Sequence, residues 1–338
     1  MRSEPFLPQE IKIAVIGGGT GSFTMLSALK EHTSQIAAIV SMADDGGSTG
    51  VLRDELGTLP PGDVRQCLVA LSDSEKVREL FQYRFDTGTF NGHSFGNVLL
   101  TALEKISGDF GEAVETASEI LHINGTVVPA TLDNVRLKMA WPDKSLVLDG
   151  ERVIDAEYFS HDPRRADLSL VPTAASNPMA ISAIEQADIV IVAPGDLYTS
   201  LGPLLIIDGI GEALERSKAM KVYVSNLVSK HGQTDGFTVS DHAKEIERFA
   251  GRPFLDHVFY NSQQPSAAVA KLYEAEGGYV TQADEDVLST AHYEAIGGPF
   301  LGKMAVNEAA DSLGAVRSLI RHDAEAVVSA ILQAYSQR

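Results

Sequence analysis

Two glycine-rich stretches contain the residue types that bind phosphate, and the one that follows the apolar run Ile36–Val40 also contains two adjacent carboxylates. It reads ADDGGSTG. Glycine amides can approach a ligand closely and hydroxyls can bind phosphate oxygens, while a carboxylate is suited to a cation or a sugar hydroxyl. A tight surface turn uses the same residue types, so this alternative stays open. The candidate ligand-binding residues here are Asp44, Asp45, Gly46, Gly47, Ser48 and Thr49.

The other stretch follows the apolar run Ile11–Ile16 and precedes a segment with helical periodicity. In a strand, glycine turn and helix of this kind, free amides and the positive end of the helix dipole bind phosphate. The G-x-G-x-G spacing differs from the dinucleotide fingerprint, so we expect neither NAD nor flavin as a bound redox cofactor. Glycines required only for a sharp turn are the alternative. The candidate residues are Gly17, Gly18, Gly19, Thr20 and Gly21.

Apolar runs predict a parallel sheet that brings both stretches to one edge. Besides the two runs named above, three more are expected to be strands, at 187–192, 221–225 and 254–260. We expect a single Rossmann-like α/β domain over residues 10–338, doubly wound around a mainly parallel sheet. It should contain a helical insertion at 60–122 and a β-rich excursion at 123–172, in which ERVIDAEYF also reads as a strand and no chemistry is apparent. Ligands of such sheets bind along the carboxyl edge.

Polar residues in the helical insertion are further candidates. Asp63 follows Pro60-Pro61-Gly62, where it is expected either to cap a helix or to face the ligand as a second carboxylate. Arg65 lies in the first turn of that helix, against the preference of the helix dipole, which favours a phosphate partner. His93 and Asn97 lie in a glycine-dense turn before another helix. His93 is expected to act as an acid, a base or a phosphate donor, or simply as a hydrogen-bonding residue near a cap.

Loops after the later strands repeat the pattern of small and hydroxyl residues before a helix. Two tail residues are also candidates: Tyr273 for stacking on a uracil ring, and Arg321 for clamping phosphate oxygens. For both, an ordinary surface position is the alternative. We expect residues 263–302 to be mobile and to close over a bound nucleotide. The loop candidates are Gly195, Tyr198, Thr199, Ser200 and Asn226.

Composition limits the compartment and the partners. The chain has 338 residues, 44% of them hydrophobic, and a formal net charge of -19. Such a charge disfavours nucleic-acid backbones and anionic membranes, and no apolar run reaches the length of about 18–20 residues that a membrane helix requires. One cysteine, Cys67, excludes an intrachain disulfide framework and suits a reducing compartment. We therefore expect a cytoplasmic protein without nucleic-acid binding or membrane insertion, in which Cys67 is buried.

The motifs together resemble the CofD/YvcK-like superfamily over about residues 11 to 261. The resemblance rests on VIGGGTG, ADDGGSTG, PPGDVRQCLVALSD, LFQYRF, GHSFGN, VVPATL, PGDLYTS and VYVSNLVSKHGQTDGF. The superfamily groups 2-phospho-L-lactate transferases with gluconeogenesis factors that bind UDP-sugars. LFQYRF, GHSFGNVLLTAL and PGDLYTS favour the UDP-sugar branch. One departure is Asp196, because the corresponding loop usually has a hydroxyl where this chain has a carboxylate that would repel phosphate.

The resemblance implies two functions of different classes. The first is a sensor of a nucleotide-sugar such as UDP-N-acetylglucosamine, acting in cell shape and envelope precursor supply under gluconeogenic growth. It would act through protein partners in envelope synthesis and as a homo-oligomer, expected to be a dimer. The second is a transferase that moves a phospho-acyl group from a nucleotide diphosphate donor. In that case Mg²⁺ on Asp45 and Asp63 would neutralise the diphosphate, assisted by Arg65.

Overall fold

A seven-stranded parallel sheet forms the centre of the protein, as the apolar runs predict. The computed structural model describes residues 11–142, 146–275, 278–302 and 321–338. The strand order is β10-β9-β8-β7-β1-β2-β3, and every neighbouring pair is parallel. The strands are β1 (Ile13–Ile16), β2 (Ile36–Val40), β3 (Thr126–Pro129), β7 (Ile189–Val192), β8 (Met220–Val224), β9 (His257–Asn261) and β10 (Glu294–Gly298).

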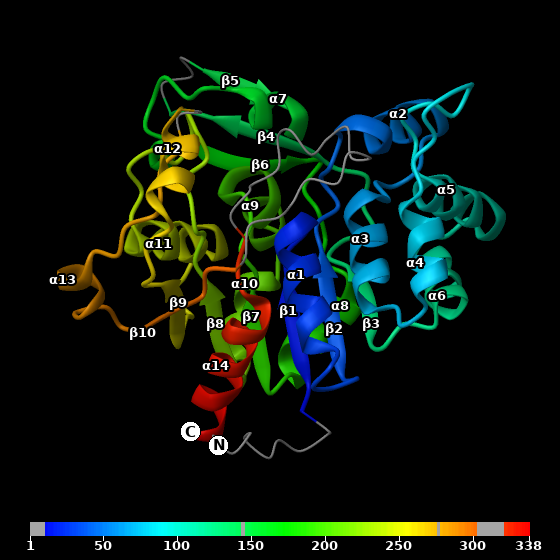
Figure 1. Ribbon diagram of the computed structural model, residues 1–338. Helices are drawn as coiled ribbons and strands as arrows, with labels where there is room; N and C mark the ends of the chain where they lie inside the picture. The colour runs from blue at the N-terminus through cyan, green and yellow to red at the C-terminus, as the bar shows by residue number, and fades with distance from the viewer. Residues whose placement is uncertain (1–10, 143–145, 276–277, 303–320) are drawn as a thin grey trace.

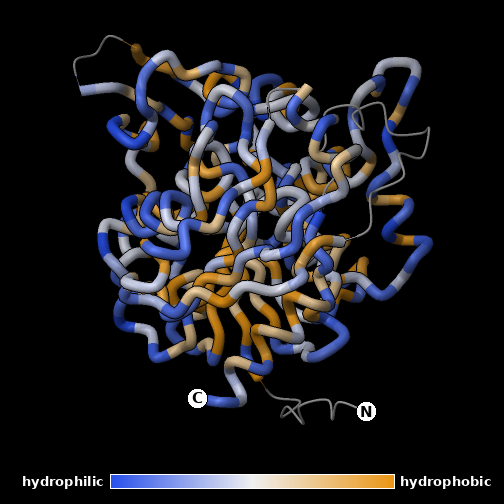
Figure 2. Tube along the Cα trace, turned by 60° about the vertical axis from the view of Figure 1, so that its left-hand side comes forward, coloured by the Kyte–Doolittle hydropathy of each residue, from blue (hydrophilic) through white to orange (hydrophobic). Residues whose placement is uncertain are grey.

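Helices cover both faces of the sheet, which confirms the doubly wound α/β class (Figure 1). Because side chains alternate along a strand, Ile13 and Val15 pack on one face while Ala14 and Ile16 pack on the other. The strands form the apolar centre in Figure 2. On the first face pack α1 (Gly19–Leu29), α3 (Gly62–Leu71), α5 (Phe95–Ser107), α6 (Phe110–Leu121) and α14 (Ala324–Ser336). On the second pack α8 (Pro178–Gln186), α9 (Gly202–Leu205), α10 (Ile210–Arg216) and α11 (Val239–Ala250).

The remaining elements are short and lie around these layers. They are the α-helices α2 (Gly47–Leu56), α4 (Glu75–Gln82), α7 (Glu151–Ala156), α12 (Ala267–Ala275) and α13 (Glu285–Leu288), the 3₁₀ turn Pro163–Arg165 and the π-helical turn Leu197–Leu201. The helical segment expected at 60–122 contains α3 to α6. No described helix is long and apolar enough to span a bilayer.

The β-rich excursion differs from the prediction at two points. Its first strand, β3, pairs with β2 and belongs to the main sheet. The separate sheet is antiparallel, in the order β5-β4-β6, formed by β4 (Arg136–Ala140), β5 (Val147–Asp149) and β6 (Asp167–Val171). The expected strand ERVIDAEYF is wrong, because residues 151–156 form α7. Glu, Arg and Ala favour a helix, and Ile154 is its one buried side chain.

The sheet reverses its order between β1 and β7, so connections leave these two neighbours in opposite directions. A crevice at the carboxyl ends of the strands is expected at such a point. Close packing fixes the position of α1 beside this crevice, because Gly21 lets α1 approach the loop after β7. A Cβ atom at this position would lie 1.7 Å from the Pro194 carbonyl oxygen.

We therefore predict that Gly21→Ala lowers the free energy of unfolding by about 1–3 kcal/mol, since the methyl group forces α1 away from backbone atoms. Gly195→Ala is the matched control in the opposing loop. Its Cβ would meet Leu201 at an ordinary 3.4 Å, so its effect should stay within about 0.5 kcal/mol. Urea denaturation of both variants measures this difference. Equal stability of the two variants would contradict the close approach.

Candidate functional site

A carboxylate from the helical segment lies against the glycine turn that follows β1. Asp63, in the first turn of α3, accepts a hydrogen bond from the Gly19 amide N–H at 3.0 Å. A Cβ atom at Gly18 would lie 2.1 Å from Asp63 Oδ2, so the carboxylate fits only against glycine. The N-cap of α3 is Pro61. Asp63 therefore does not cap its own helix, and of the two roles expected for it the structure favours the carboxylate that faces the turn.

Asp44 and Asp45 point in different directions, as expected for adjacent residues in an extended stretch. Asp44 accepts from the Gly46 amide N–H at 2.9 Å and from the Thr49 hydroxyl, and its charge acts on Asp63. Asp45 instead accepts from the Arg152 amide N–H at 2.7 Å. The inward carboxylate is therefore Asp44, whereas the family resemblance implied Asp45 as the metal-binding carboxylate.

Asp45 links the glycine loop after β2 to the β-rich excursion. One carboxylate oxygen holds the Arg152 amide at the start of α7, and the other lies 3.5 Å from the Arg136 guanidinium on β4. These contacts place Glu151 beside the same loop, where its carboxyl oxygen would lie 3.6 Å from a Cβ atom at Gly46. Reasoning from the sequence missed Glu151, although this residue ends the turn sequence LDGE and begins α7.

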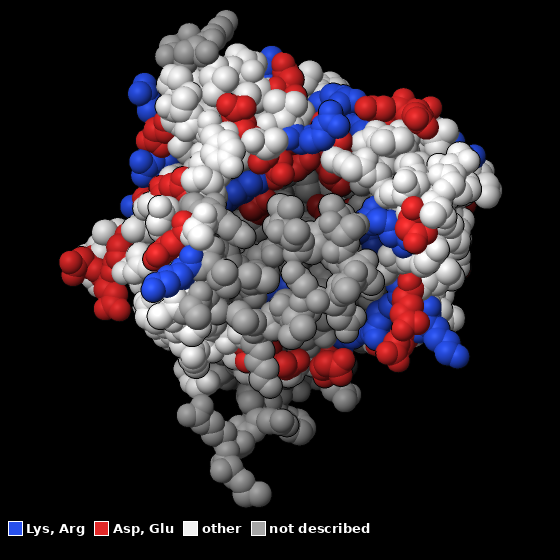
Figure 3. All heavy atoms as spheres, turned by 45° about the horizontal axis from the view of Figure 1, so that its top comes forward, with Lys and Arg blue, Asp and Glu red and all other residues white. Residues whose placement is uncertain are grey.

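Three carboxyl groups from different segments are therefore electrostatically coupled. Burial, together with the charge of Asp44, raises the pKa of Asp63 to about 7 and that of Glu151 to about 9. Burial also raises the pKa of Asp44. Figure 3 shows acidic side chains gathered in a hollow on this side of the molecule, with basic side chains at its border. Additional negative charge at this position requires a compensating positive charge or proton.

A chain of hydrogen bonds joins the helical segment to the loop after β2. Arg65 Nε donates to Asn97 Oδ1 at 2.8 Å, which turns the Asn97 amide so that Nδ2 donates to Ser48 Oγ at 3.3 Å. Ser48 Oγ lies 3.0 Å from His93 Nδ1. Which of these two atoms donates depends on the tautomer of His93. The structure thus brings four predicted site residues together.

Two hydrogen bonds join the loop after β7 to the loop after β8. Asn226 Nδ2 donates to the Gly195 carbonyl at 2.8 Å, and the Gly195 amide donates to Asn226 Oδ1 at 3.3 Å. Asp196, the departure from the family pattern, is paired with Lys230 at 3.0 Å, and Lys230 also pairs with Asp155. The negative charge of Asp196 is therefore balanced locally.

Tyr198 is not placed for ligand contact. Its side chain is 1% exposed, and its hydroxyl donates a hydrogen bond of 3.0 Å to Glu245 of α11. The irregular turn Leu197–Leu201 directs it into the core, where its ring packs against Phe249. The prediction of Tyr198 as a ligand residue is therefore wrong. In the same turn Thr199 is buried and Ser200 is half-buried.

The tail reaches the sheet edge through a residue that the sequence did not single out. His322 Nε2 lies 3.1 Å from the Ser225 carbonyl after β8, and burial lowers the His322 pKa to about 4. Arg321 is exposed, and its carbonyl accepts from the Gly302 amide. Tyr273 belongs to α12, but its side chain lies outside the described part of the chain. Cys67 is buried as expected, which raises its pKa.

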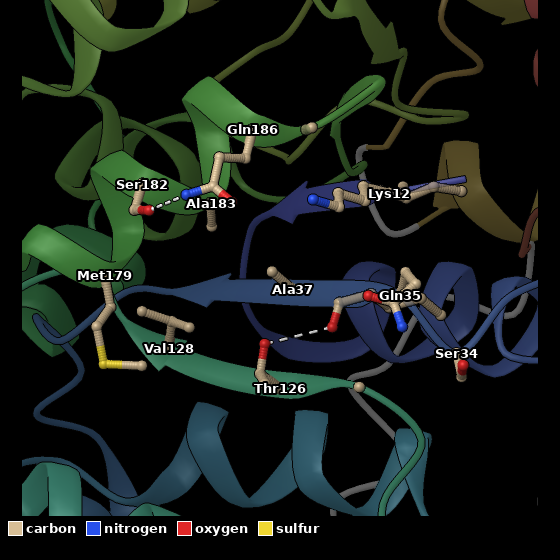
Figure 4. A pocket seen from close by; sticks show the side chains of 14 residues that line it. Lys12, Ser34, Gln35, Ala37, Thr126, Val128, Met179, Ser182, Ala183 and Gln186 are labelled. Atoms are coloured by element: carbon tan, nitrogen blue, oxygen red, sulfur yellow. Dashed lines mark hydrogen bonds between the residues drawn. The ribbon is translucent and has the colours of Figure 1, made fainter. Parts of the chain in front are cut away.

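A separate cavity of about 470 Å³ lies at the opposite, amino edge of the sheet (Figure 4). Lys12, Gln35 and Thr126 line it together with α8, on which Ser182 and Gln186 are joined by a hydrogen bond of 2.6 Å. None of the predicted site residues lines this cavity. Over the described ranges, no three His, Cys, Asp or Glu side chains are grouped closely enough to hold a metal ion by themselves.

The raised pKa of Asp63 predicts a pH-dependent stability. The folded state retains the proton up to about pH 7, whereas the unfolded chain loses it near pH 4, so this contribution is present at low pH and is lost as the pH rises through about 7. Asp63→Asn removes the penalty of ionisation, so its stability relative to wild type should increase by up to about 1.4 kcal/mol per pH unit between pH 4 and 7. Thermal unfolding against pH measures it, with the exposed Asp86→Asn as control. A pH-independent difference would contradict the electrostatic coupling.

Comparison with known proteins places this arrangement in a family. The family described as 2-phospho-L-lactate transferase CofD matches residues 13–301. The gluconeogenesis factor of Bacillus subtilis is 40% identical over 291 residues, covering 85% of this chain and 90% of that protein. A crystal structure of a Bacillus halodurans protein has 35% identity and a TM-score of 0.84, covering 95% of this chain and 98% of the other.

Other relatives are longer than this chain. One from Clostridium acetobutylicum is 41% identical over 86% of this chain, and one from Nostoc is 43% identical over 82%. The chain spans only 64% and 61% of the length of these two relatives. Since the family match includes both glycine turns and nearly all of the sheet, the protein belongs to the CofD/YvcK-like superfamily, with gluconeogenesis factors among its relatives.

Proposed function

We propose that the protein binds a nucleotide-sugar of the UDP-N-acetylglucosamine type and acts as a regulatory protein rather than as an enzyme. The observation that supports this best is the convergence of two glycine turns, after the neighbouring strands β1 and β2, at the carboxyl edge of the sheet. One turn presents amides at the start of α1, and the other presents Ser48 oriented by Arg65 and Asn97. Amides at a helix start and oriented hydroxyl and amide donors are suited to a diphosphate.

The physiological setting follows from the relatives, several of which are gluconeogenesis factors. We propose that occupancy by the nucleotide-sugar reports envelope precursor supply during gluconeogenic growth, with consequences for cell shape. The protein would do so in the cytoplasm, as a homodimer, through protein partners in envelope synthesis.

A transferase activity is the second candidate, because the family description names a transferase. The donor set fits Mg²⁺, a hard cation that is commonly bound by one or two carboxylates together with substrate phosphates. Asp44 and Asp63 would hold it, and Arg136 and the Arg152 amide engage Asp45 instead. Bound Mg²⁺ would neutralise the charge of the diphosphate. ³¹P NMR of UDP-N-acetylglucosamine with the protein, Mg²⁺ and an acceptor alcohol separates the candidates. A sensor leaves the ligand intact, whereas a transferase passes the outer phosphate with its linked group to the acceptor and releases the nucleoside monophosphate.

Asn97→Ala tests the site. The substitution removes the amide that orients Ser48 and the carbonyl oxygen that accepts from Arg65 Nε. We therefore expect the affinity for UDP-N-acetylglucosamine to fall about tenfold. Isothermal titration calorimetry measures it. Ala183→Trp, which fills the cavity at the amino edge, is the control and should change the affinity less than about twofold. Wild-type affinity in Asn97→Ala, or a loss of binding in Ala183→Trp, would place the ligand elsewhere.

The two acidic residues of the loop should differ in their response to metal. Asp44→Asn removes a carboxylate that faces Asp63, so nucleotide binding should lose its dependence on Mg²⁺. Asp45→Asn should retain that dependence, because Asp45 is engaged by Arg136 and the Arg152 amide. Calorimetric titrations with and without MgCl₂ compare the two variants. The reverse pattern would restore the assignment of Asp45 as the inward carboxylate.

A further inference from the structure

The cavity at the amino edge of the sheet lies at the opposite end of the strands from the glycine turns. It is formed between α8 and the second face of the sheet (Figure 4). Ala37 on β2 and Ala183 on α8 both line it, and their short side chains leave open a space that larger side chains would fill. Its volume of about 470 Å³ is within the range of about 300–1,000 Å³ that is typical of small-molecule sites.

Hydrogen bonds fix both ends of α8 and so hold the cavity open. At the start of the helix, the Asn177 amide N–H donates to the Ala130 carbonyl at 2.8 Å, and Asn177 Nδ2 donates to the Pro129 carbonyl at 2.9 Å. After its end, the Asp188 amide N–H donates to the Lys12 carbonyl at 2.8 Å, and the Asp188 carboxylate accepts from the Lys12 amide N–H at 2.8 Å. The helix is therefore held at the end of β3 and at the start of β1, and the cavity exists before a ligand binds.

Lys12 gives the cavity its charge. Among the described residues that line the cavity, Lys12 is the only charged one. Its side chain extends toward α8, on which Ala183 and Gln186 lie (Figure 4). Over the part of the chain that the structure describes, no carboxylate lies within ion-pair distance of the Lys12 ammonium group, and the nearby Asp188 carboxylate accepts from the Lys12 backbone instead. An ammonium group in this position favours a ligand that has a negative charge.

The other lining residues limit what can accompany that charge. Ser182 Oγ accepts from Gln186 Nε2 at 2.6 Å, which leaves the hydroxyl hydrogen of Ser182 for another acceptor. Ala37, Val128 and Met179 present apolar surface. One cation and a few neutral donors match a singly charged carboxylate, whereas a diphosphate requires more positive charge. The apolar surface matches a short hydrocarbon chain.

We propose that this cavity binds a small monocarboxylate with an apolar chain. The carboxylate pairs with the Lys12 ammonium group, and the chain lies between Ala37 and Ala183. The site is separate from the nucleotide site, because the two lie at opposite ends of the strands. Binding here therefore does not require that the proposed nucleotide-sugar function is correct.

Hexanoate is the probe, and NMR of the methionine methyl groups locates its binding. Met179 lines the cavity, whereas Met25 is buried on the other face of the sheet. Added hexanoate should shift the Met179 signal, assigned with Met179→Leu, to saturation and should leave the Met25 signal in place. Hexan-1-ol and hexylammonium have the same chain without the negative charge, so each should bind at least about tenfold more weakly. An unshifted Met179 signal would overturn the proposal, and so would equal binding of hexan-1-ol.

Two pairs of variants test the contacts. Lys12→Met should weaken hexanoate at least about tenfold, and Lys218→Met, an exposed residue that precedes β8 and does not line the cavity, should not. Ala183→Trp should abolish binding, whereas Glu185→Trp, exposed on the same helix and outside the lining, should retain it. Asn97→Ala should bind hexanoate as the wild type does. Wild-type affinity in either cavity variant would overturn the proposal, and a loss in Asn97→Ala would do so by placing hexanoate at the glycine turns.

Discussion

The hydrogen bond from the Gly19 amide to the Asp63 carboxylate is the contact on which the site depends. An amide at the start of α1, of the kind that binds phosphate in other α/β proteins, is already occupied by a carboxyl group of the protein itself. Asp44 adds a second carboxylate and Glu151 a third. We therefore expect a diphosphate to bind here only with compensation for its charge, as the proposed binding together with a divalent cation would provide.

The rest of the molecule maintains this arrangement by joining the two sides of the crevice. The β-rich excursion contacts the loop after β2 through Asp45, which holds the Arg152 amide. On the other side, Lys230 pairs with Asp155, and Gln233 Nε2 donates to the Ile154 carbonyl at 2.8 Å. α7 is thereby held from both sides, so that Glu151 reaches the glycine loop. We therefore expect ligand binding in this crevice to depend on the position of the excursion.

Features that depend on neighbouring residues could be predicted from the sequence. Features that depend on contacts between residues far apart in the chain could not. Continuous apolar runs predict β1, β2 and β7 because both faces of a parallel sheet are buried. Strand β10 was not predicted, because its sequence EAIGG lies at the sheet edge and contains two glycines. The choice between Asp44 and Asp45 depends on Arg152, more than 100 residues away. Tyr198 was misjudged because Glu245, its buried partner, lies on a distant helix.

The central claim is that the diphosphate of a nucleotide-sugar lies at the carboxyl edge of the sheet. A crystal structure of the protein with UDP-N-acetylglucosamine and Mg²⁺ tests it most directly. We predict phosphate density at the glycine turn after β1 and at the Ser48 hydroxyl, with a cation between the phosphates and Asp44. Phosphate density in the cavity beside Lys12 and Gln35, at the other end of the strands, would contradict it.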